Sequence, residues 1–480
     1  MAGMTRPPSR ESLDAIRNLL GSGGWLDSPD DRAPFETDFR RLHRGSTPLV
    51  ALPDSSAKVA ELVRLCAARG IGMVPQGGNT SYCGGATPRA GGTDIVISLR
   101  RMRRIRAVDA ASDSMTAEAG CVLAELQDAA AAANRLLPMS LGSEGSCTLG
   151  GIISTNAGGM AVLRYGMMRA LVLGLEAVLP DGTVLDQLTA LRKDNTGYDV
   201  KQLFIGAEGT LGIVTAASLR LWPRPAAFAT VLAAVGSPAD AVRLLGRQRE
   251  ALGDAVTTFE LIPRIALEFV CRHVPATRDP FEHAHEWYVL TEISLPQADS
   301  DLGGRFESVL ASAIEDGVAN DAATATSDAQ REAFWRLREM IPESQRHEGP
   351  GLKHDVSVET AQLPRFIDEG RSLIERLAPG SRLVAYGHLG DGNLHFNVSA
   401  PHGSDGGELA RAADAIGRGV HDLVARYRGS ISAEHGIGQL KVAELARYED
   451  PAALALMHRI KQAIDPRGIM NPGKVLGDRG

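Results

Sequence analysis

The chain has 480 residues, of which 44% are hydrophobic and 23% charged, and its formal net charge is −7. At roughly 100–200 residues per domain this length predicts two to three domains, and the composition is that of a globular protein with a large core. The acidic balance argues against nucleic acid as a partner, because nucleic-acid-binding domains are usually basic on one face. Five cysteines without a CxxC pair argue against a disulfide framework and a thiolate zinc site.

The N-terminal residues lack the apolar core of a secretory signal peptide, and no stretch reaches the ~18–20 apolar residues that span a bilayer. Together with the few, scattered cysteines, this predicts a cytoplasmic protein in a reducing compartment. A peripheral position at a membrane surface stays open.

Predicted helices and strands alternate along most of the chain. Apolar spacing predicts helices at 10–20, 57–69, 123–134, 239–251 and 330–342, and strands at 49–52, 72–75, 94–98, 115–118, 171–179, 212–221, 286–294 and 383–388. The rigid segment 222–225, Trp-Pro-Arg-Pro, ends the first alternating region. These patterns predict an N-terminal helical segment at 1–44, domains at 45–226 and 227–430, and a C-terminal segment at 431–480.

Three glycine-rich segments lie in the first predicted domain, at 74–85, 141–159 and 204–212. Glycines permit tight turns in which neighbouring backbone N–H groups converge on an anion such as a pyrophosphate. The first segment fits neither the P-loop nor the GxGxxG dinucleotide pattern, and alone it would be more typical of a surface turn. Three such segments in one domain favour one extended ligand, such as a dinucleotide, held by backbone at several points.

Two histidines in the second predicted domain flank a turn-forming segment, since His388 and His395 lie on either side of 390–393, Gly-Asp-Gly-Asn. A spacing of seven would place them on opposite faces of one straight strand. The turn instead predicts two strands joined by a tight loop, which can bring both imidazoles to one side. Glu434, followed by His435, adds a carboxylate, and this set suits zinc, manganese, cobalt or iron(II). Each histidine alone is more typical of a core or surface position.

The glycine-rich segments, with 164–166, 193–215 and 470–474, resemble in order the FAD-binding domain of the vanillyl-alcohol oxidase type, also called PCMH-type. This resemblance covers about residues 45–225 and the C-terminus. It implies an α+β protein whose FAD-binding domain, at 45–226, has two α/β subdomains. A substrate-binding (cap) domain with an antiparallel sheet follows at 227–430, and a helical segment at 431–480 returns to the flavin.

The same resemblance implies that the first glycine-rich segment holds the pyrophosphate, that Glu208 and Ile213 lie near the adenine–ribose end, and that Asn471 lies near the flavin ring. The implied cofactor-binding residues are Pro75, Gly77, Gly78, Asn79, Thr80, Gly84, Gly142, Ser143, Ser146, Gly151, Asn156, Glu208, Ile213 and Asn471. Some members of this fold attach the flavin through a histidine, commonly in the first segment. Residues 70–95 contain no histidine, so non-covalent FAD is expected. Gln76 replaces an arginine that many relatives carry, which removes a charge near the cofactor.

The segments 387–395 and 432–438 resemble the C-terminal domain of flavin-dependent D-2-hydroxy-acid dehydrogenases. This group includes D-2-hydroxyglutarate dehydrogenase, D-lactate dehydrogenase and the glycolate oxidase flavin subunit. The resemblance implies that His388, His395 and Glu434 bind a divalent metal, zinc foremost, and that His435 is the general base. A neutral imidazole, with an ordinary pKa of about 6.5, can take a proton near neutral pH.

Arg338, Lys353 and Asn393 match the family's substrate contacts, and an arginine can grip a carboxylate with two parallel hydrogen bonds. Pro342 departs from a threonine found in 2-hydroxyglutarate dehydrogenases, and proline cannot donate a hydrogen bond. Segments 193–203 and 352–357 still favour a dicarboxylate. The predicted reaction is oxidation of a D-2-hydroxy acid, D-2-hydroxyglutarate before D-malate or D-lactate, to the 2-oxo acid. A homodimer and an electron-transfer flavoprotein or quinone as acceptor are expected.

Alternative functions remain open from the residues alone. The chain can be the flavin subunit of a glycolate or D-lactate oxidase complex, or a flavin-bearing scaffold without catalysis. A metal-dependent hydrolase would use the same His/His/Glu set but leaves the glycine-rich segments unexplained. An alkyl-transfer role, known for one branch of this fold, fits the Arg338 and Lys353 pattern less well.

Overall fold

The computed structural model describes residues 5–299 and 301–477. The chain divides into two compact units. Unit 1 consists of Met1–Gly159, Gly166–Arg224 and Glu434–Gly480, and unit 2 of Met160–Tyr165 and Pro225–Ala433. Unit 1 is therefore assembled from segments on both sides of unit 2 in the sequence. The four-part division predicted from the sequence remains a prediction.

The first sheet of unit 1 is mostly parallel. Its strands, in spatial order, are β1 (Trp25–Leu26), β2 (Val50–Ala51), β4 (Asp94–Ser98) and β3 (Gly72–Gln76). Helix α3 (Ser56–Arg69) connects β2 to β3 and buries Val59, Leu62 and Val63. The helix begins after Ser55, whose side chain accepts the N–H of Lys58, as N-terminal serines commonly do. The helix predicted at 57–69 is confirmed because local periodicity and capping agree.

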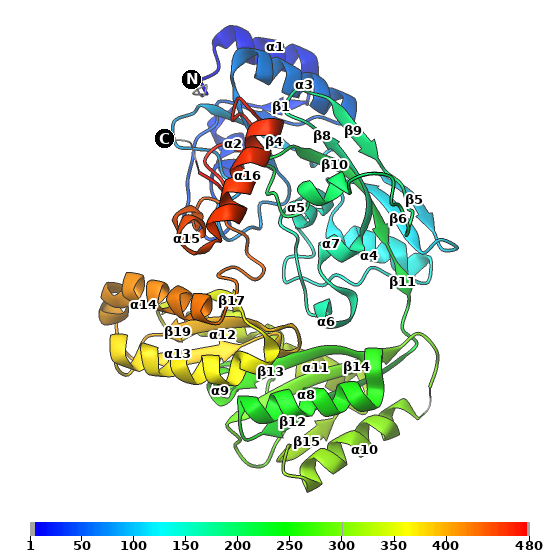
Figure 1. Cartoon of the computed structure of the whole chain (residues 1–480), viewed down its shortest axis with the longest axis vertical. Coiled ribbons are helices and arrows are strands. Elements are labelled where there is room, and N and C mark those ends of the chain that lie inside the picture. Colours follow the sequence, from blue (N-terminus) through cyan, green and yellow to red (C-terminus); the bar gives the residue numbers. More distant parts are fainter. Residues whose placement is uncertain (1–4, 300, 478–480) are drawn as a thin grey trace. The chain divides into compact units, whose positions relative to one another are not determined.

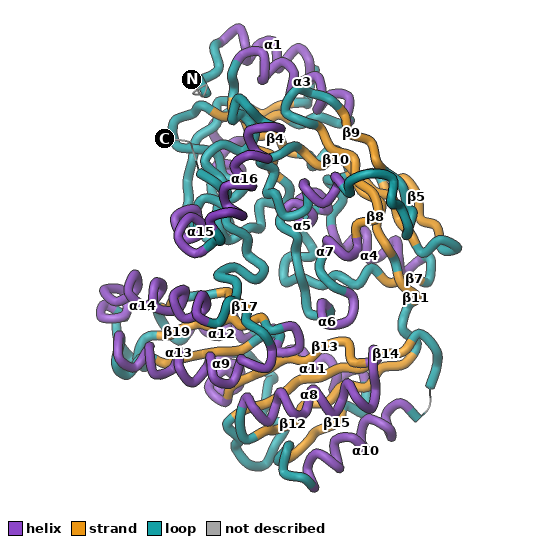
Figure 2. The backbone as a smooth tube through the Cα atoms, in the orientation of Figure 1, coloured by secondary structure: helices purple, strands orange, loops and turns teal. Residues whose placement is uncertain are grey.

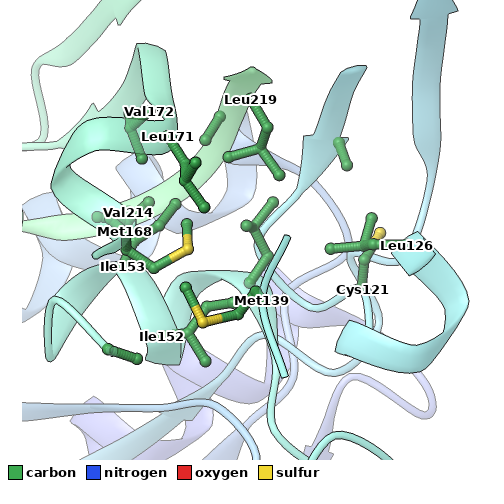
Figure 3. Packing of buried hydrophobic residues seen from close by; sticks show 14 of the residues in the cluster. Cys121, Leu126, Met139, Ile152, Ile153, Met168, Leu171, Val172, Val214 and Leu219 are labelled. Atoms are coloured by element: carbon green, nitrogen blue, oxygen red, sulfur yellow. The ribbon is translucent and has the colours of Figure 1, made fainter. Parts of the chain in front are cut away.

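The second sheet of unit 1 is antiparallel. Its strands, in spatial order, are β5 (Ile105–Asp109), β6 (Ser114–Glu118), β10 (Ile213–Arg220), β8 (Val172–Val178) and β9 (Val184–Gln187). Leu219 and Val214 of β10 pack with Ile152, Met168 and Leu126 in one apolar cluster (Figure 3). Ile152 comes from α5 (Leu149–Ser154), a short helix inside the second glycine-rich segment. This packing fixes that segment against the sheet.

The remaining elements of unit 1 are helices and two short strands that pair with each other. They are α1 (Arg10–Leu20), α2 (Pro29–Glu36), α4 (Leu123–Ala132), β7 (Arg135–Leu136), α7 (Met168–Leu171), η1 (Val200–Leu203), β11 (Trp222–Pro223), α15 (Val442–Tyr448) and α16 (Pro451–Ile464). The C-terminal segment joins the first sheet, because Met470 forms a bridge with Met73 and the N–H of Asn471 donates to the carbonyl of Met73 at 2.8 Å. Residues about 400 positions apart thus complete one unit.

Unit 2 contains two antiparallel sheets, drawn as orange strands in Figure 2. The first, in spatial order, has β13 (Val256–Pro263), β14 (Trp287–Leu295), β12 (Ala227–Val235) and β15 (Asp321–Thr324). The second has β16 (Gly351–Leu352) and β17 (Asp355–Ser357) on one side of β19 (Asn393–Ser399), and β18 (Arg382–Tyr386) on the other. The loop predicted between two strands around Gly390–Asn393 is confirmed: β18 pairs antiparallel with β19, and η4 (Leu389–Asp391) lies between them.

The helices of unit 2 cover its sheets. They are α6 (Val162–Tyr165), α8 (Pro238–Leu252), η2 (Gly253–Ala255), α9 (Arg264–His273), α10 (Leu302–Glu315), α11 (Asp328–Glu339), α12 (Ile341–His347), η3 (Thr360–Gln362), α13 (Leu363–Leu377) and α14 (Gly407–Arg426). Figure 1 shows α13 and α14 side by side. Among the described residues of the chain, we find no helix with the length and apolarity needed to cross a bilayer.

The single helix predicted at 330–342 is wrong in extent, because the chain breaks it at Met340 into α11 and α12. Pro342 lies in the first turn of α12, where its missing N–H costs nothing. In a continuous helix its ring would clash with the carbonyl of Arg338. The proline therefore begins a new helix.

Glu348, at the end of α12, is buried and joins three parts of unit 2. Its carboxylate accepts hydrogen bonds from Arg272, His273 and Arg382. Burial raises its pKa, but these hydrogen bonds outweigh burial and bring the pKa to about 2, against 4.5 for an ordinary glutamate. Since the folded-state pKa is depressed, the stabilisation is complete above about pH 4.5 and is lost as the pH falls towards 2.

We expect Glu348→Gln to lower the free energy of unfolding by about 1–3 kcal/mol at pH 7, because charged donors lose their carboxylate. Urea denaturation should show this difference unchanged from pH 7 to about pH 4.5 and shrinking from there to pH 3. Glu343→Gln is the matched control, since Glu343 pairs with Arg346 at 2.9 Å on the exposed side of the same helix. A difference that stays constant down to pH 3 would contradict the charge argument.

Candidate active site

His388, His395 and Glu434 come together, as one potential ligand atom of each lies within 4.8 Å of the others. His388 immediately precedes η4, and His395 lies in β19 opposite Tyr386. The two imidazole centroids are 5.7 Å apart. Glu434 directly follows Ala433, whose N–H donates to the carbonyl of Asp355 at 3.4 Å. A hairpin end and the segment after Ala433 thus supply two nitrogens and a carboxylate to one place.

Glu260 of β13, which is not among the residues predicted from the sequence, orients His388. The Nδ1 of His388 lies 2.5 Å from one Glu260 oxygen, and the Nε–H of Arg338 donates to the other at 2.6 Å. Burial alone would raise the pKa of Glu260, but the charges and hydrogen bonds of Arg338 and His388 hold it well below its usual range. An ionised carboxylate only accepts, so His388 carries its proton on Nδ1, which leaves Nε2 able to bind a metal.

Asn393 lies at the start of β19 and is 5% exposed. Its Nδ2 donates to Asp355 at 2.9 Å and to the carbonyl of Val356 at 3.0 Å. Its Oδ1 has no hydrogen-bond partner within residues 5–299 and 301–477. A buried acceptor without a donor is costly, which favours a ligand or water here. The Oδ1 of Asp355 is also 4.0 Å from the Nδ1 of His395.

The two predicted cationic substrate contacts lie on different elements of unit 2. Arg338, on α11, is 6% exposed, and its guanidinium carbon stands 5.0 Å from the ring centroid of Tyr386. Lys353 is exposed in the short connection between β16 and β17. Arg338 thus belongs to the buried group around Glu260, whereas Lys353 lies two residues before Asp355. Their binding roles remain predictions.

The glycine-rich segments of unit 1 meet one another. A Cβ on Gly77 would lie 2.3 Å from the Oγ1 of Thr148, and one on Gly78 would lie 2.1 Å from the carbonyl oxygen of Ser146. The first segment therefore packs on the second. The Thr148 hydroxyl is buried and unpartnered in the part of the chain that the structure describes. The third segment joins them, since the N–H of Glu208 donates to the carbonyl of Ser154 at 2.8 Å.

We expect Gly78→Ala to weaken FAD binding about tenfold or more. Its new Cβ would strike backbone atoms of Ser146, and such overpacking typically costs about 1–3 kcal/mol. Gly145→Ala is the matched control, because a Cβ there meets nothing within 4 Å. Fluorescence titration of apoprotein with FAD measures both dissociation constants. Equal affinities for the two variants would contradict a close role of Gly78.

Glu208 links the third glycine-rich segment to the segment after His435. Its carboxylate accepts the N–H groups of Ile437 at 2.7 Å and Gly438 at 2.9 Å. Burial raises the pKa of this carboxyl, and the two backbone donors oppose the rise. The carbonyl of Glu208 accepts from the Nδ2 of Asn471 at 2.6 Å. Glu208, predicted only as a cofactor contact, thus also joins two segments of unit 1 that lie far apart in the sequence.

In unit 1, a side chain contacts His435, and backbone carbonyls hold Asn471. The ring of His435 lies edge-on to Tyr82, with centroids 4.7 Å apart. Asn471 is 2% exposed and also donates to the carbonyl of Gly85 at 2.8 Å. Its Oδ1 is buried without a partner among the described residues. Asn471 therefore offers one buried acceptor to a ligand.

The other predicted cofactor residues all lie in unit 1. In and after β3 lie Pro75, Asn79, Thr80 and Gly84. Around α5 lie Gly142, Ser143 and Ser146 before the helix, Gly151 within it and Asn156 after it. The first residue of β10 is Ile213. The amide of Gln76 is buried and donates to the carbonyls of Phe35 at 3.0 Å and Ala86 at 2.8 Å. This residue thus ties α2 to the first glycine-rich segment, as an internal link that needs no charge. Asn79 donates similarly to the carbonyl of Thr37 at 2.8 Å.

Comparisons with known proteins agree with this architecture. Residues 47–187 match the model of the FAD binding domain, and residues 224–475 match that of the FAD linked oxidases, C-terminal domain. A mitochondrial D-2-hydroxyglutarate dehydrogenase of Arabidopsis thaliana is 35% identical over 476 residues, which are 98% of this chain and 83% of the relative. Its counterpart in Bos taurus is 38% identical over 475 residues, 98% of this chain and 84% of that protein.

A solved structure of p-cresol methylhydroxylase with substrate bound shares the fold. It superposes with a TM-score of 0.75 over 98% of each chain, at 16% sequence identity. At this identity the likeness concerns the fold alone. The expected vanillyl-alcohol oxidase-type α+β architecture is thereby confirmed.

The expectation of a cytoplasmic protein is wrong, because these D-2-hydroxyglutarate dehydrogenases are named mitochondrial. Cysteine usage separates oxidising from reducing compartments but does not separate two reducing ones. Targeting depends on segments read by receptors, and the composition of the folded body does not reveal it.

The matched domains, the near full-length relatives and the expected sequence motifs agree. The chain belongs to the FAD-linked oxidases and is an FAD-dependent dehydrogenase of the vanillyl-alcohol oxidase fold.

Proposed function

We propose that this dehydrogenase oxidises a D-2-hydroxy acid, D-2-hydroxyglutarate foremost, to the 2-oxo acid with the help of a divalent metal. The observation that carries the proposal is the group of His388, His395 and Glu434, in which Glu260 fixes the tautomer of His388. The relatives named D-2-hydroxyglutarate dehydrogenase support the substrate. Two imidazoles and a carboxylate with open positions suit zinc foremost, with manganese, cobalt and iron(II) as alternatives.

Unit 1 fits a non-covalent FAD. Two buried oxygens have no hydrogen-bond partner among the described residues, namely Thr148 Oγ1 and Asn471 Oδ1, and a bound ligand or water can supply one. The first two glycine-rich segments also pack tightly together. The absence of histidine from 70–95 favours non-covalent attachment. The predicted contacts from Pro75 to Gly84, from Gly142 to Asn156, and at Glu208, Ile213 and Asn471 are retained in this proposal. Bound FAD would supply the acceptor for the hydride that leaves the substrate.

The chain's own residues bind the substrate and move its proton. Arg338 gives its Nε–H to Glu260, and we assign its guanidinium to a substrate carboxylate, a group that arginine can hold with two parallel hydrogen bonds. We assign Lys353 to a second carboxylate, and Asn393 Oδ1 to a substrate hydroxyl or a water. A divalent ion at His388, His395 and Glu434 would lower the pKa of the substrate hydroxyl. His435, steadied by Tyr82, then takes the hydroxyl proton.

An anaerobic flavin-reduction screen over D- and L-2-hydroxy acids tests the proposal. The flavin absorbance should bleach with D-2-hydroxyglutarate, more slowly with D-malate and D-lactate, and not with L-acids. Reduction by L-acids alone would refute the stereochemistry, and a preference for glycolate or D-lactate would identify a subunit of an oxidase complex. Hydrolytic activity that survives removal of the flavin would support the hydrolase instead.

We also propose a homodimer that passes electrons to an electron-transfer flavoprotein or a quinone. The absence of a nicotinamide-binding motif supports such acceptors over NAD. Reoxidation of the reduced enzyme by each acceptor, and light scattering for the oligomeric state, check these two points. Reoxidation by NAD would refute the proposed acceptors, and a monomer in solution would refute the homodimer.

A further inference from the structure

We propose that Glu260 is a positioning residue that couples the metal site to the substrate-binding cation. One carboxylate oxygen sets the tautomer of His388, and the other fixes the direction of Arg338. This inference rests on the proposed function, in which His388 binds the metal and Arg338 the substrate.

Glu260 lies in a buried position, where an ionised carboxylate needs charged or hydrogen-bonding partners. It is 0% exposed within β13, and its sequence neighbours Phe259 and Leu261 are buried apolar residues. A buried carboxylate without charged or hydrogen-bonding partners is very costly. Each of its oxygens receives a short contact, from His388 Nδ1 at 2.5 Å and Arg338 Nε at 2.6 Å. The carboxylate is thus shared between two side chains of different proposed roles.

The backbone fixes this geometry as well. The N–H of Leu261 donates to the carbonyl of Gly387 at 2.8 Å, and the N–H of Gly387 donates back to Leu261 at 3.0 Å. Leu261 follows Glu260 in the chain, and Gly387 precedes His388. The bridge therefore holds the two side chains in register, although 128 positions separate them.

The chemistry of the two donors predicts which of them loses its hydrogen bond to an oxygen when glutamine replaces Glu260. The new amide would have one accepting oxygen and one donating NH₂ for two donors. Arginine cannot give up its protons, so the amide oxygen must face Arg338. His388 can move its proton from Nδ1 to Nε2 and accept from the NH₂ group. In that tautomer Nε2 has no lone pair for a metal.

Unit 2 offers a matched control for loss of a buried carboxylate. Glu292 of β14 is 5% exposed and accepts from Arg331 Nε at 2.6 Å and from Trp335 Nε1 at 3.1 Å. It lies on the same sheet as Glu260, and its described partners include no histidine. Glu292→Gln therefore makes the same chemical change without altering a tautomer.

The experiment compares zinc affinity in FAD-loaded wild type, Glu260→Gln, Glu292→Gln and Arg338→Met. Metal-stripped proteins are titrated with zinc against a competing chelator, and flavin content reports folding. Glu260→Gln should bind zinc about 10–100-fold more weakly, as is typical when a metal-bound histidine loses its carboxylate partner. Glu292→Gln should stay within about threefold of wild type, whereas Arg338→Met serves the substrate side and should raise the KM for the D-2-hydroxy acid.

Equal zinc affinity in Glu260→Gln and Glu292→Gln would overturn the inference. If Glu260→Gln does not fold, Glu260→Asp replaces it, and its shorter side chain should also weaken zinc binding; wild-type affinity in Glu260→Asp would overturn the inference too. The titration needs no substrate. Wild type that binds zinc but whose flavin no D-2-hydroxy acid reduces would refute the proposed function and leave the role of Glu260 intact.

Discussion

Replacing His435 by asparagine is expected to slow anaerobic flavin reduction by a D-2-hydroxy acid about 10²–10⁴-fold, the usual contribution of a positioned general base. Asparagine is polar and smaller than histidine, so the edge contact with Tyr82 is loosened rather than replaced by a clash. The flavin spectrum and the metal content should persist, because His435 is assigned to neither ligand set. Stopped-flow absorbance of the flavin measures the rate directly.

His402→Asn provides the control for this change, since His402 is exposed in the connection between β19 and α14. It should reduce the flavin at the wild-type rate. A His435→Asn enzyme that is reduced as fast as this control would assign the proton transfer to another group. Loss of flavin from the variant would instead indicate a role in holding the cofactor.

Removal of the divalent metal should slow flavin reduction at least about a hundredfold. A metal that polarises the substrate oxygen contributes several kcal/mol, and each 1.4 kcal/mol is a factor of ten in rate. The His388, His395 and Glu434 group would lose its bound ion, while the FAD-binding segments of unit 1 would not be changed chemically. The measurement is single-turnover flavin reduction after dialysis against a chelator.

Zinc, manganese, cobalt and iron(II) are then added back separately, and the metal that restores the rate identifies the native ion. The control is the same chelator already saturated with metal, which should leave the rate unchanged. Full activity in protein shown by elemental analysis to be metal-free would refute metal assistance. The alternative would then be that His388 and His395 act as hydrogen-bond donors alone.

Local patterns predicted much of the fold. The helix at 57–69 has apolar spacing and a serine cap, and the strands around Gly390–Asn393 are joined by a strong turn signal. The break at Met340 was missed although Pro342 was visible, because the apolar pattern continues through it. Where a proline and an apolar pattern disagree, backbone sterics decide the helix end.

Residues of the site that share a local sequence pattern were predicted, whereas contacts between distant segments were not. His388 and His395 share a local turn, which carries a signal in the sequence. Glu260 acts on His388 across 128 positions, and Glu208 accepts from Ile437 across 229 positions. Strand pairing and packing between distant segments bring such partners together, so no local sequence pattern indicates the pairing. The local sign of Glu260 is a charged residue inside an otherwise uncharged strand.

The bridge between Met73 and Met470 has a consequence for synthesis of the protein. The ribosome makes the first segments of unit 1 early, but residues 225–433 must follow before Asn471 exists. At about 5–20 residues per second, synthesis of the roughly 390 residues between the first glycine-rich segment and Asn471 takes roughly 20–80 s. Throughout that time β3 and the first glycine-rich segment lack their C-terminal partner. The C-terminal side of the predicted FAD-binding region therefore forms late in the folding of unit 1.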